Sequence, residues 1–336
     1  MLTCLVIGDP HFKVSNILDT DRMTEAILKV AHERQPTFIV VLGDTLDRHE
    51  SIHVSPLKRA TMFLHELSLI SPTYLLIGNH DLKNNQQFLS NEHPFTAFKY
   101  WGLRLTVVDT TTIVSINDNV FTFVPYVPPG RFEEALNTIE NWQHSTAIFG
   151  HQEFKGVKMG PIVSVEGDDW PLSYPYVITG HIHNYDEPQA NIVSVGAPIQ
   201  HAFGDTHDKT ISYFTFTNNE QGSFRSHERI DLRLPKKLII RISAHDVPTY
   251  VPPTNTQLKI CISGTAGELK AIMNHPNINK WKNIDHHKIS KKILPLESDN
   301  SSMFLQNSGN GKYSEILYSM ILNNQLLTQC YHDIFG

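Results

Sequence analysis

Five short polar motifs follow one another between residues 9 and 183 of this 336-residue chain. In order, they are Asp9-Pro-His11, Gly43-Asp44-x-x-Asp47, Gly78-Asn79-His80-Asp81, Gly150-His151 and Gly180-His181-x-His183. Their carboxylate and amide oxygens and imidazole nitrogens are the kinds of ligand that two neighbouring divalent cations require. Two such cations generate a hydroxide-like nucleophile at neutral pH and bind both oxygens of a phosphoryl displacement. The ordered set therefore predicts a two-metal hydrolytic centre.

The motifs differ in how strongly each one indicates a metal ligand. The pair Asp9-x-His11 is of a common kind, and Asp44 could equally be a helix cap residue. The tetrapeptide at 78–81 is far more specific. At roughly 5% usage per residue, a given tetrapeptide occurs by chance in about one chain of this length in 500. The Gly-His-x-His motif is moderately specific, and we expect its two histidines to lie on a turn.

Short apolar runs alternate with helical patterns through the first 230 residues and would position these motifs. Strand-like runs occur at 3–7, 37–42, 73–77, 105–108, 120–124, 146–149, 176–179, 192–195 and 211–217. Helical patterns occur at about 20–34, 56–70 and 131–143. The early strand–helix–strand order predicts a parallel sheet, and the closely spaced later strands predict a second, more antiparallel sheet. Two sheets flanked by helices is the simplest α/β architecture.

The motifs stand where the apolar runs end. Asp9, Asp44, Asn79, His151 and His181 each follow a strand-like run, with a glycine directly before or close by. Ligands of α/β sheets gather at the carboxyl ends of the strands. We therefore expect these five side chains to converge at one edge.

The composition changes at about residue 235. Residues 236–295 predict a small α+β module, with strands at 237–243 and 257–262, a helix at 267–275 and a His- and Lys-rich stretch at 280–292. A polar, turn-rich linker follows at 296–311, and residues 312–336 have the pattern of an amphipathic helix. We expect the metal motifs to lie in a separate domain that spans residues 1–235.

The charge of the chain is uneven. The net charge is −6, but residues 1–235 contain 17 Lys and Arg against 27 Asp and Glu, whereas residues 236–336 contain 11 against 7. A basic region beside a carboxylate-rich one suits an enzyme with an anion-binding surface next to its active site. A solvated basic face explains any single lysine equally well.

The cysteines and the apolar runs bear on the compartment. Cys4, Cys261 and Cys330 are few and far apart, which argues against a disulfide framework. No signal-peptide pattern opens the chain, and no run approaches the roughly 18 apolar residues that a membrane span requires. We expect an intracellular protein, in the cytoplasm, nucleoid or nucleus, that is not secreted and makes no membrane contact.

The five ordered motifs resemble those of the calcineurin-like metallophosphoesterases over roughly residues 1–217. Neighbouring segments narrow the resemblance to the double-strand-break repair nuclease family, which includes bacterial SbcD and phage recombination-endonuclease subunits. Residues 195–205 resemble that family's Pro-Gly-Ser to Phe-Gly-Glu segment, and residues 123–126 resemble its strand followed by Pro-Tyr or Pro-Trp. This resemblance implies a four-layer αββα sandwich, a small α+β capping domain that binds DNA, and C-terminal helices that dock on a partner ATPase.

The resemblance also implies roles for individual residues. The metal ligands would be Asp9, His11 and His183 for one cation, Asn79, His151 and His181 for the other, and Asp44 as the bridge. His80 would be aimed at the leaving oxygen or scissile phosphate, and Asp81 would orient its ring. A third metal ligand or a structural histidine remains the alternative for His80. Two Mn²⁺ ions fit such mixed ligands best, with iron or zinc as alternatives and magnesium less suited.

Two sets of residues near the motifs receive weaker assignments. Arg48 could contact substrate phosphates, although a solvated loop explains it equally well, and Asp47 receives no catalytic role. The histidines outside the motifs are interpreted as surface or packing residues; they include His32, His53, His65, His93, His144, His201 and His207.

The function that the sequence favours is a manganese-dependent DNA nuclease with exonuclease and single-strand endonuclease activity. It would work in a recombination or repair complex with an SMC-like ATPase, because no phosphate-binding loop of the Gly-x-x-x-x-Gly-Lys type occurs in this chain. A homodimer could form through the helix at 56–70. One alternative is a small-substrate phosphatase or cyclic-nucleotide phosphodiesterase on the same fold. Another is a non-catalytic tether of DNA ends, which the complete set of metal motifs disfavours.

Overall fold

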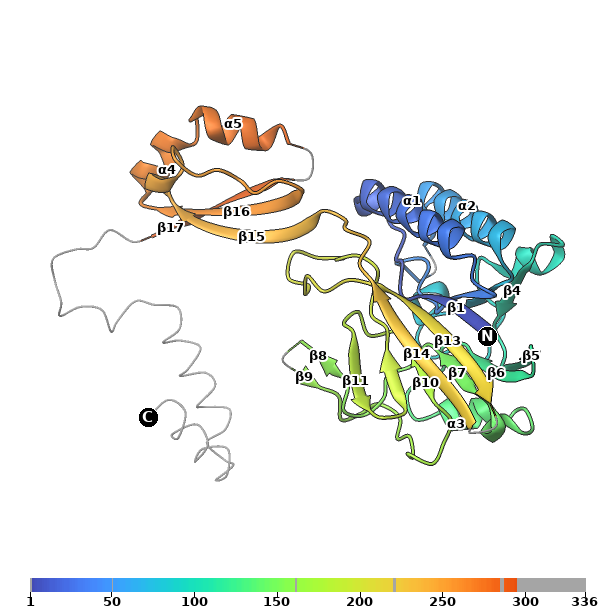
Figure 1. Cartoon of the computed structure of the whole chain (residues 1–336). Coiled ribbons are helices and arrows are strands. Elements are labelled where there is room, and N and C mark those ends of the chain that lie inside the picture. The colour runs from blue at the N-terminus through green and yellow to red at the C-terminus, as the bar shows by residue number, and fades with distance from the viewer. Residues whose placement is uncertain (1, 50, 161, 220–221, 285–286, 295–336) are drawn as a thin grey trace, which may run out of the picture.

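Two six-stranded sheets packed face to face form the body of the molecule (Figure 1). The computed structural model describes residues 2–49, 51–160, 162–219, 222–284 and 287–294. A buried core lies between the sheets, where the ring of Phe38 contacts that of Phe121 at 5.2 Å between centroids. With helices on both outer faces, the predicted α/β sandwich is confirmed.

The first sheet has the order β14–β13–β1–β2–β3–β4. Its strands are β1 (Leu2–Ile7), β2 (Phe38–Val41), β3 (Thr73–Leu76), β4 (Leu105–Val108), β13 (Ile211–Asn219) and β14 (Gly222–Ile230). β1 to β4 are parallel, and β13 and β14 are added antiparallel at the β1 edge. Helices α1 (Ile17–Arg34) and α2 (Val54–Ile70) cover the outer face, where Met23 and Phe63 pack in one core with Leu5.

The second sheet has the order β11–β12–β10–β7–β6–β5. Its strands are β5 (Thr112–Ile116), β6 (Asn119–Val124), β7 (Ala147–Gly150), β10 (Val177–Thr179), β11 (Asp186–Gln189) and β12 (Ile192–Ser194). Helix α3 (Phe132–Leu136) and the loop residues Trp142 and Trp170 cover its outer face. A two-stranded hairpin, β8 (Lys158–Met159) and β9 (Ile162–Val163), projects from the loop before β10.

The second sheet is not more antiparallel than the first, so that prediction was wrong. Each sheet has three parallel and two antiparallel pairings. The long segments before β7 and β10 act as crossovers and return the chain in the same direction. The third predicted helix is also shorter than expected. α3 ends at Leu136, and residues 142–144 form a separate 3-10 turn that buries Trp142.

A separate three-stranded sheet lies beside the body (Figure 1). Its strands β15 (Lys236–Ser243), β16 (Thr256–Gly264) and β17 (Lys288–Ile293) are all parallel. Helices α4 (Ala266–Ile272) and α5 (Pro276–Lys282) pack against one face through Leu269, Ile278 and Trp281. Residues 236–293 therefore have a core of their own, while the division of the chain into domains stays a prediction.

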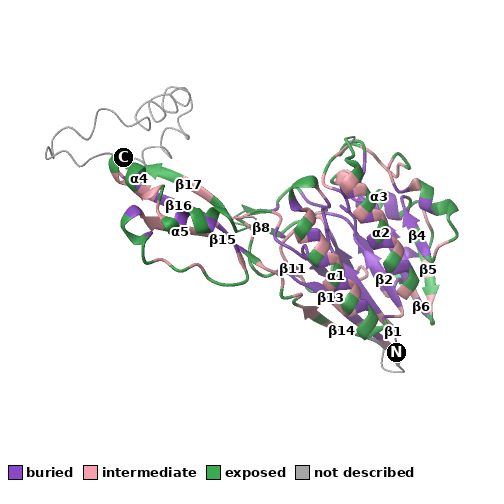
Figure 2. Ribbon diagram, turned by 90° about the horizontal axis from the view of Figure 1, so that it is seen from above, coloured by how far each residue is buried: buried purple, intermediate pink, exposed green. Residues whose placement is uncertain are grey.

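Burial follows this architecture. Figure 2 shows buried residues along the strands of the two large sheets, with exposed residues on the outward sides of the helices. Among the described residues, no helix combines the length and apolarity that a membrane span requires. The predicted linker at 296–311 and the predicted helical tail at 312–336 lie outside the described residues.

Candidate metal centre

The candidate ligands lie at one edge, where strands of both sheets end. Asp9 follows β1, Asp44 follows β2 and Asn79 follows β3, while His151 follows β7 and His181 follows β10. Within each sheet these strands are parallel, so the loops after them meet at the same edge. The expected convergence of these five side chains therefore occurs.

The backbone turns sharply at this edge. His11, Asp44 and His181 have φ angles of 47°, 45° and 78°. Such a conformation costs a non-glycine residue about 1–3 kcal/mol, and three of these residues meet at this edge. Gly78 allows two ligand loops to approach each other, because a Cβ there would lie 2.2 Å from the backbone nitrogen of Asp44.

The first group of candidate ligands contains His11 and His183, whose ring nitrogens face each other, with Asp9 as the predicted third member. The Nε2 atoms of His11 and His183 lie 3.0 Å apart, and Asp44 Oδ2 lies 3.5 Å from His11 Nε2. Asp9 is fully buried, and its Oδ1 accepts the backbone N–H of His181. Its Oδ2 is buried and has no hydrogen-bond partner among the described residues. A buried carboxylate oxygen without a hydrogen-bond donor calls for a positively charged partner.

Asn79, His151 and His181 form the second group. Asn79 Oδ1 lies 3.0 Å from His151 Nε2 and 3.0 Å from His181 Nδ1. His151 is fully buried, and its Nδ1 lies 2.7 Å from the backbone carbonyl of Leu42. That hydrogen bond keeps a proton on Nδ1 and turns Nε2 toward the site, as in many histidine metal ligands.

Asp44 lies between the two groups. Its Oδ2 faces His11, whereas its Oδ1 lies 3.4 Å from His151 Nε2 and accepts the backbone N–H of His80. Burial alone would raise the pKa of Asp44, but the nearby His151 and His11 lower it below its usual range. Burial alone would likewise lower the pKa of His151, but Asp44 and Asp9 raise it to about 9. The field at this position therefore stabilises positive charge.

The donor set fits two divalent cations. The ligand atoms of Asp44, His151 and His181 all lie within 4.8 Å of one another. Oxygen and nitrogen atoms alone make up both groups, which suits manganese, iron or zinc. Each group would hold one cation, and Asp44 has one oxygen directed to each.

His80 lies at the open side of the centre. Its Nδ1 lies 2.9 Å from the backbone carbonyl of Asp47, and its Nε2 lies 4.0 Å from Asp44 Oδ2. The side chain is 35% exposed, which leaves it accessible to a substrate. The ring of His49 stacks on it at 5.0 Å between centroids.

Asp81 does not lie where the sequence interpretation placed it. Its buried carboxylate accepts the backbone N–H groups of Leu46 at 2.8 Å, Gly78 at 3.1 Å and Thr45 at 3.2 Å. Burial, and secondly the neighbouring Asp44, raises the pKa of Asp81 to about 7. The group that holds the His80 ring is the Asp47 carbonyl, while Asp81 joins the two loops that carry the bridging and amide ligands.

Arg48 lines a cleft of about 410 Å³ beside the centre. We call it the rim cleft; its lining also includes Phe12, Lys13, Val14, Ser15, Asp47, Ile52 and His201. A cation and an apolar wall next to a metal site suit a phosphorylated substrate with an apolar part. The structure thus places Arg48 close to the centre, and its contact with substrate stays a prediction.

His201 was interpreted as a surface or packing residue, but it lies at the metal centre. Its ring contacts those of His11 and His183, with centroids 4.7 Å and 4.9 Å apart. The loop that carries it follows β12, which runs parallel to β10 and so ends at the same edge. That topology is the signal that could have found it, because a lone histidine forms no motif.

Comparison with known proteins places the chain in a family. The sequence profile of the family described as calcineurin-like phosphoesterase matches residues 2–185, more than half of the chain. The chain belongs to the calcineurin-like phosphoesterases.

Viral relatives resemble this phosphoesterase over most of its length. It is 43% identical over 271 residues to "Putative phosphoesterase 244L" of Invertebrate iridescent virus 6, which covers 80% of this chain and 95% of the relative. It is 41% identical over 274 residues to "Putative phosphoesterase 078R" of Invertebrate iridescent virus 3, covering 80% and 78%. A solved archaeal phosphodiesterase aligns with 68% of this chain and 100% of its own, at 11% identity and a TM-score of 0.34, which is too distant to add to the assignment.

These findings confirm the coarser predictions. The chain is a metallophosphoesterase, a hydrolase of phosphate esters on an αββα sandwich, and its family uses divalent metals. The narrower resemblance to double-strand-break repair nucleases, the identity of the metal and the roles of individual residues stay predictions.

Proposed function

We propose that this phosphoesterase is a manganese-dependent DNA nuclease, with exonuclease and single-strand endonuclease activity, that hydrolyses phosphodiester bonds at a two-metal centre. The observation that supports this most is a second cleft of about 440 Å³, which we call the junction cleft. It adjoins the rim cleft, because both are lined by Lys13, Ser15 and His201. The two clefts together connect His201, beside the candidate metal ligands, with Lys259 and Lys288 of the three-stranded sheet.

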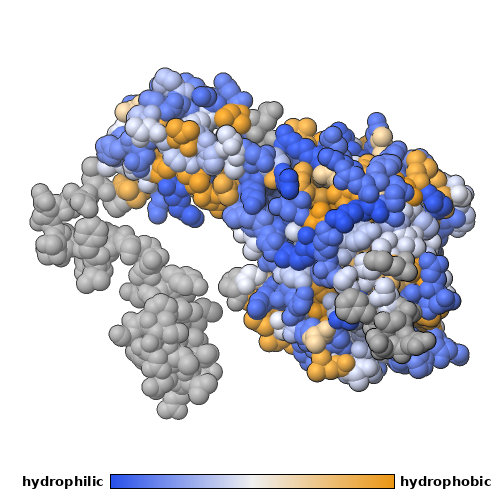
Figure 3. All heavy atoms as spheres, viewed as in Figure 1, coloured by the Kyte–Doolittle hydropathy of each residue, from blue (hydrophilic) through white to orange (hydrophobic). Residues whose placement is uncertain are grey.

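The junction cleft is basic on the side of the three-stranded sheet. Helices α4 and α5 cover one face of that sheet, and Lys259 and Lys288 are register partners that line the cleft with Ile239. Lys288 lies 5.6 Å from the centre of the Phe203 ring. Figure 3 shows hydrophilic residues where this sheet meets the body. Lysines spaced along a groove are what the repeated phosphates of a nucleic acid require.

The chain's own residues suit phosphodiester hydrolysis. Cations bound at the centre would supply a hydroxide-like nucleophile and neutralise charge on the phosphate. His80 is held through Nδ1 by the Asp47 carbonyl, so its Nε2 is free to act. In its protonated form, it can give the Nε2 proton to the leaving oxygen as a general acid. Arg48 and Lys13 would bind the neighbouring phosphates from the rim cleft.

The alternative functions use less of this surface. A small-substrate phosphatase or cyclic-nucleotide phosphodiesterase would occupy the rim cleft and leave Lys259 and Lys288 without a ligand. A non-catalytic tether of DNA ends would need neither His80 at the open side nor an orphaned Asp9 oxygen. Both observations favour the nuclease.

Two partners complete the proposal. A recombination or repair complex would supply an SMC-like ATPase, bound through residues 312–336, which lie outside the described residues. A homodimer would form through α2, whose Met62 and Leu69 are 54% and 56% exposed, together with the 56%-exposed Trp101. Met62 and Trp101 line one surface hollow, and a contiguous apolar patch can mark an interface.

A substrate panel tests the proposal. The purified chain with Mn²⁺ is given linear duplex DNA, circular single-stranded DNA and the small diester bis(p-nitrophenyl) phosphate. We expect all three to be cleaved, and His80→Ala to slow cleavage of the two DNA substrates by about 10²-fold or more, with a smaller effect on the small diester, whose p-nitrophenolate leaves without a proton. Hydrolysis of the small diester without cleavage of either DNA, with or without its ATPase, would rule out the nuclease. Undiminished cleavage by His80→Ala would rule out the role of His80.

A further inference from the structure

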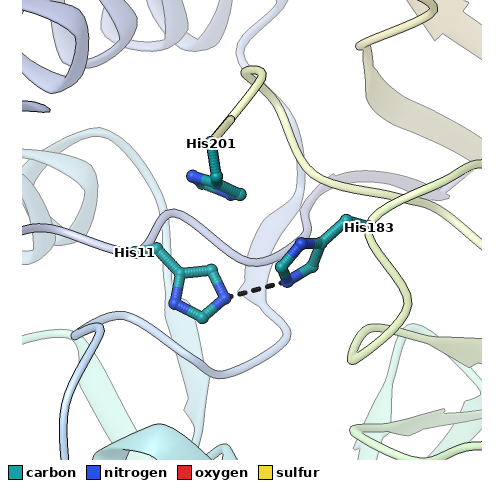
Figure 4. Close-up of side chains that lie close together, drawn as sticks. All are labelled: His11, His183 and His201. Carbon is teal, nitrogen blue, oxygen red and sulfur yellow. Dashed lines mark hydrogen bonds between the residues drawn. The ribbon is translucent and has the colours of Figure 1, made fainter. Parts of the chain in front are cut away.

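We propose that His201 is an additional ligand of the first cation, beside Asp9, His11 and His183. This inference rests on the two-metal centre proposed above. Figure 4 shows the ring of His201 lying over those of His11 and His183, with the three side chains converging from different loops. A ligand nitrogen from each of the three histidines lies within 4.8 Å of the other two. That spacing is short enough for one ion to contact all three, since Mn²⁺, like Zn²⁺, lies about 2 Å from an imidazole nitrogen.

The hydrogen bonds of His201 leave one nitrogen for an ion. Its Nε2 lies 3.1 Å from the backbone carbonyl of Asp9, which can only accept, so the proton is on Nε2. Its Nδ1 then has a lone pair, is buried, and has no partner among the described residues. Metal-bound histidines usually donate their other ring N–H to a carbonyl or carboxylate, which fixes the ring and the tautomer.

The second half of the centre has the same arrangement. His151 is bonded through Nδ1 to the carbonyl of Leu42 and turns its Nε2 toward Asn79 and Asp44. His201 shows this pattern with the two nitrogens exchanged. Both histidines thus bond a backbone carbonyl in a loop that follows a strand of the first sheet. His201 bonds the carbonyl of Asp9, after β1, and His151 bonds the carbonyl of Leu42, after β2.

The loop of His201 is held in place independently of any ion. The carboxylate of Asp205 accepts the backbone N–H groups of His201 at 2.7 Å and Ala202 at 3.0 Å. The side-chain amide of Gln200 bonds the backbone of Lys237 in β15: its NH₂ group donates to the carbonyl and its oxygen accepts the N–H. If His201 were only a packing residue, its buried Nδ1 would have no hydrogen-bond donor. Leaving a buried acceptor unsatisfied costs about 1–3 kcal/mol. An ion at Nδ1 would remove that cost.

Titration with Mn²⁺ alone tests the assignment without relying on activity. Isothermal titration calorimetry is run on the full chain, on His201→Ala, and on the control His144→Ala, which removes an exposed histidine before β7. We expect two Mn²⁺ sites in the wild type and the control, and in His201→Ala a loss of about tenfold or more at one site only. Pulsed electron paramagnetic resonance of bound Mn²⁺ should lose one nitrogen coupling in His201→Ala.

Thermal denaturation separates a ligand from a packing residue. For a ligand, His201→Ala leaves the melting temperature of the metal-free chain near the wild-type value and reduces the increase that Mn²⁺ causes. A lower melting temperature without metal, together with an unchanged Mn²⁺ increase and unchanged nitrogen couplings, would overturn the proposal. If the wild type binds no Mn²⁺, the two-metal centre itself fails, and His201 has no ion to bind.

Discussion

The two-sheet body and the three-stranded sheet bury different kinds of residue. We call the edge of the body that carries the candidate ligands the rim. The fully or almost fully buried residues there include Asp9, Asp44 and His151. In the three-stranded sheet the buried residues are apolar, except for Lys237 and Gln257. Both of these polar residues bond Asp19 of helix α1, so they belong to the contact with the body.

This contrast separates chemistry from substrate binding. Buried charges are costly unless they are paired or bind metals, and Asp9, Asp44 and His151 bring several such groups together at the rim. Apart from Lys237, the three-stranded sheet keeps its lysines partly or fully exposed, where they cost little and can attract a polyanion. We therefore expect substitutions at the rim to slow the reaction on every substrate, and substitutions on the sheet to affect DNA alone.

The largest effect is expected for Asp44→Asn, at the bridge between the two ligand groups. The amide has one oxygen where two are needed and lacks the negative charge that both cations would share. Because a metal centre contributes several kcal/mol to the transition state, hydrolysis of the small diester should fall by about 10³-fold or more. Calorimetry should show that both Mn²⁺ sites weaken. Asp169→Asn, at an exposed carboxylate paired with Lys155, is the control, and an Asp44→Asn chain that keeps both affinities would contradict the bridge.

The next effect concerns Asp81→Asn. The carboxylate accepts three backbone N–H groups from the loops that carry Asp44 and Asn79. An asparagine can accept through one oxygen only, and its NH₂ group would face an N–H donor. We expect kcat to fall about 10- to 100-fold, as for residues that hold metal ligands, and the free energy of unfolding to fall by about 1–3 kcal/mol. Steady-state kinetics and urea denaturation measure the two. Unchanged stability would mean that Asp81 does not join the loops.

The positions of these rim residues followed from sequence because each ends an apolar run. Parallel strands carry their next residues to a shared edge, so Asp9, Asn79 and His181 could be grouped by their places in the chain alone. The partners of Asp81 could not be found in that way. A carboxylate next to His80 in sequence was expected to orient its ring, whereas the turn at 79–81 directs it to backbone groups of another loop.

Other features depend on contacts that no local pattern records. His201 reaches the centre only because β12 runs parallel to β10, and sequence spacing favoured antiparallel pairing there. Strand β17 was hidden because three of its six residues are lysines. The strand is stabilised by its pairing with β16, which brings Ile289 into the core beside Ile260.

The double substitution Lys259→Ala/Lys288→Ala tests the other side of the comparison. These lysines line the junction cleft and lie outside the rim cleft. We expect affinity for DNA to fall about tenfold and the salt dependence of binding to drop by about one to two units of slope, with no change on the small diester. Fluorescence anisotropy at several salt concentrations gives both quantities. Lys280→Ala/Lys282→Ala, on helix α5, is the matched control. If both double variants lose the same affinity for DNA, the effect comes from net charge and not from the position of Lys259 and Lys288.

The smallest effect is expected for Asp19→Asn, at the contact between the two regions. Asp19 Oδ2 lies 3.0 Å from Lys237 Nζ, with side chains 11% and 9% exposed, and its Oδ1 accepts a hydrogen bond from Gln257. Removing the charge leaves a nearly buried ammonium that still donates to the Gln200 carbonyl but has lost its ion pair. We expect a loss of about 1–2 kcal/mol at this contact, which is roughly a tenfold change in local opening. Hydrogen exchange should therefore quicken about tenfold in β15 and β16 but not in β2 and β3.

Asp21→Asn removes an ion pair with Arg59 that lies wholly within the body, so it should leave β15 unchanged. Faster exchange in β2 would show that Asp19 stabilises the body rather than the contact.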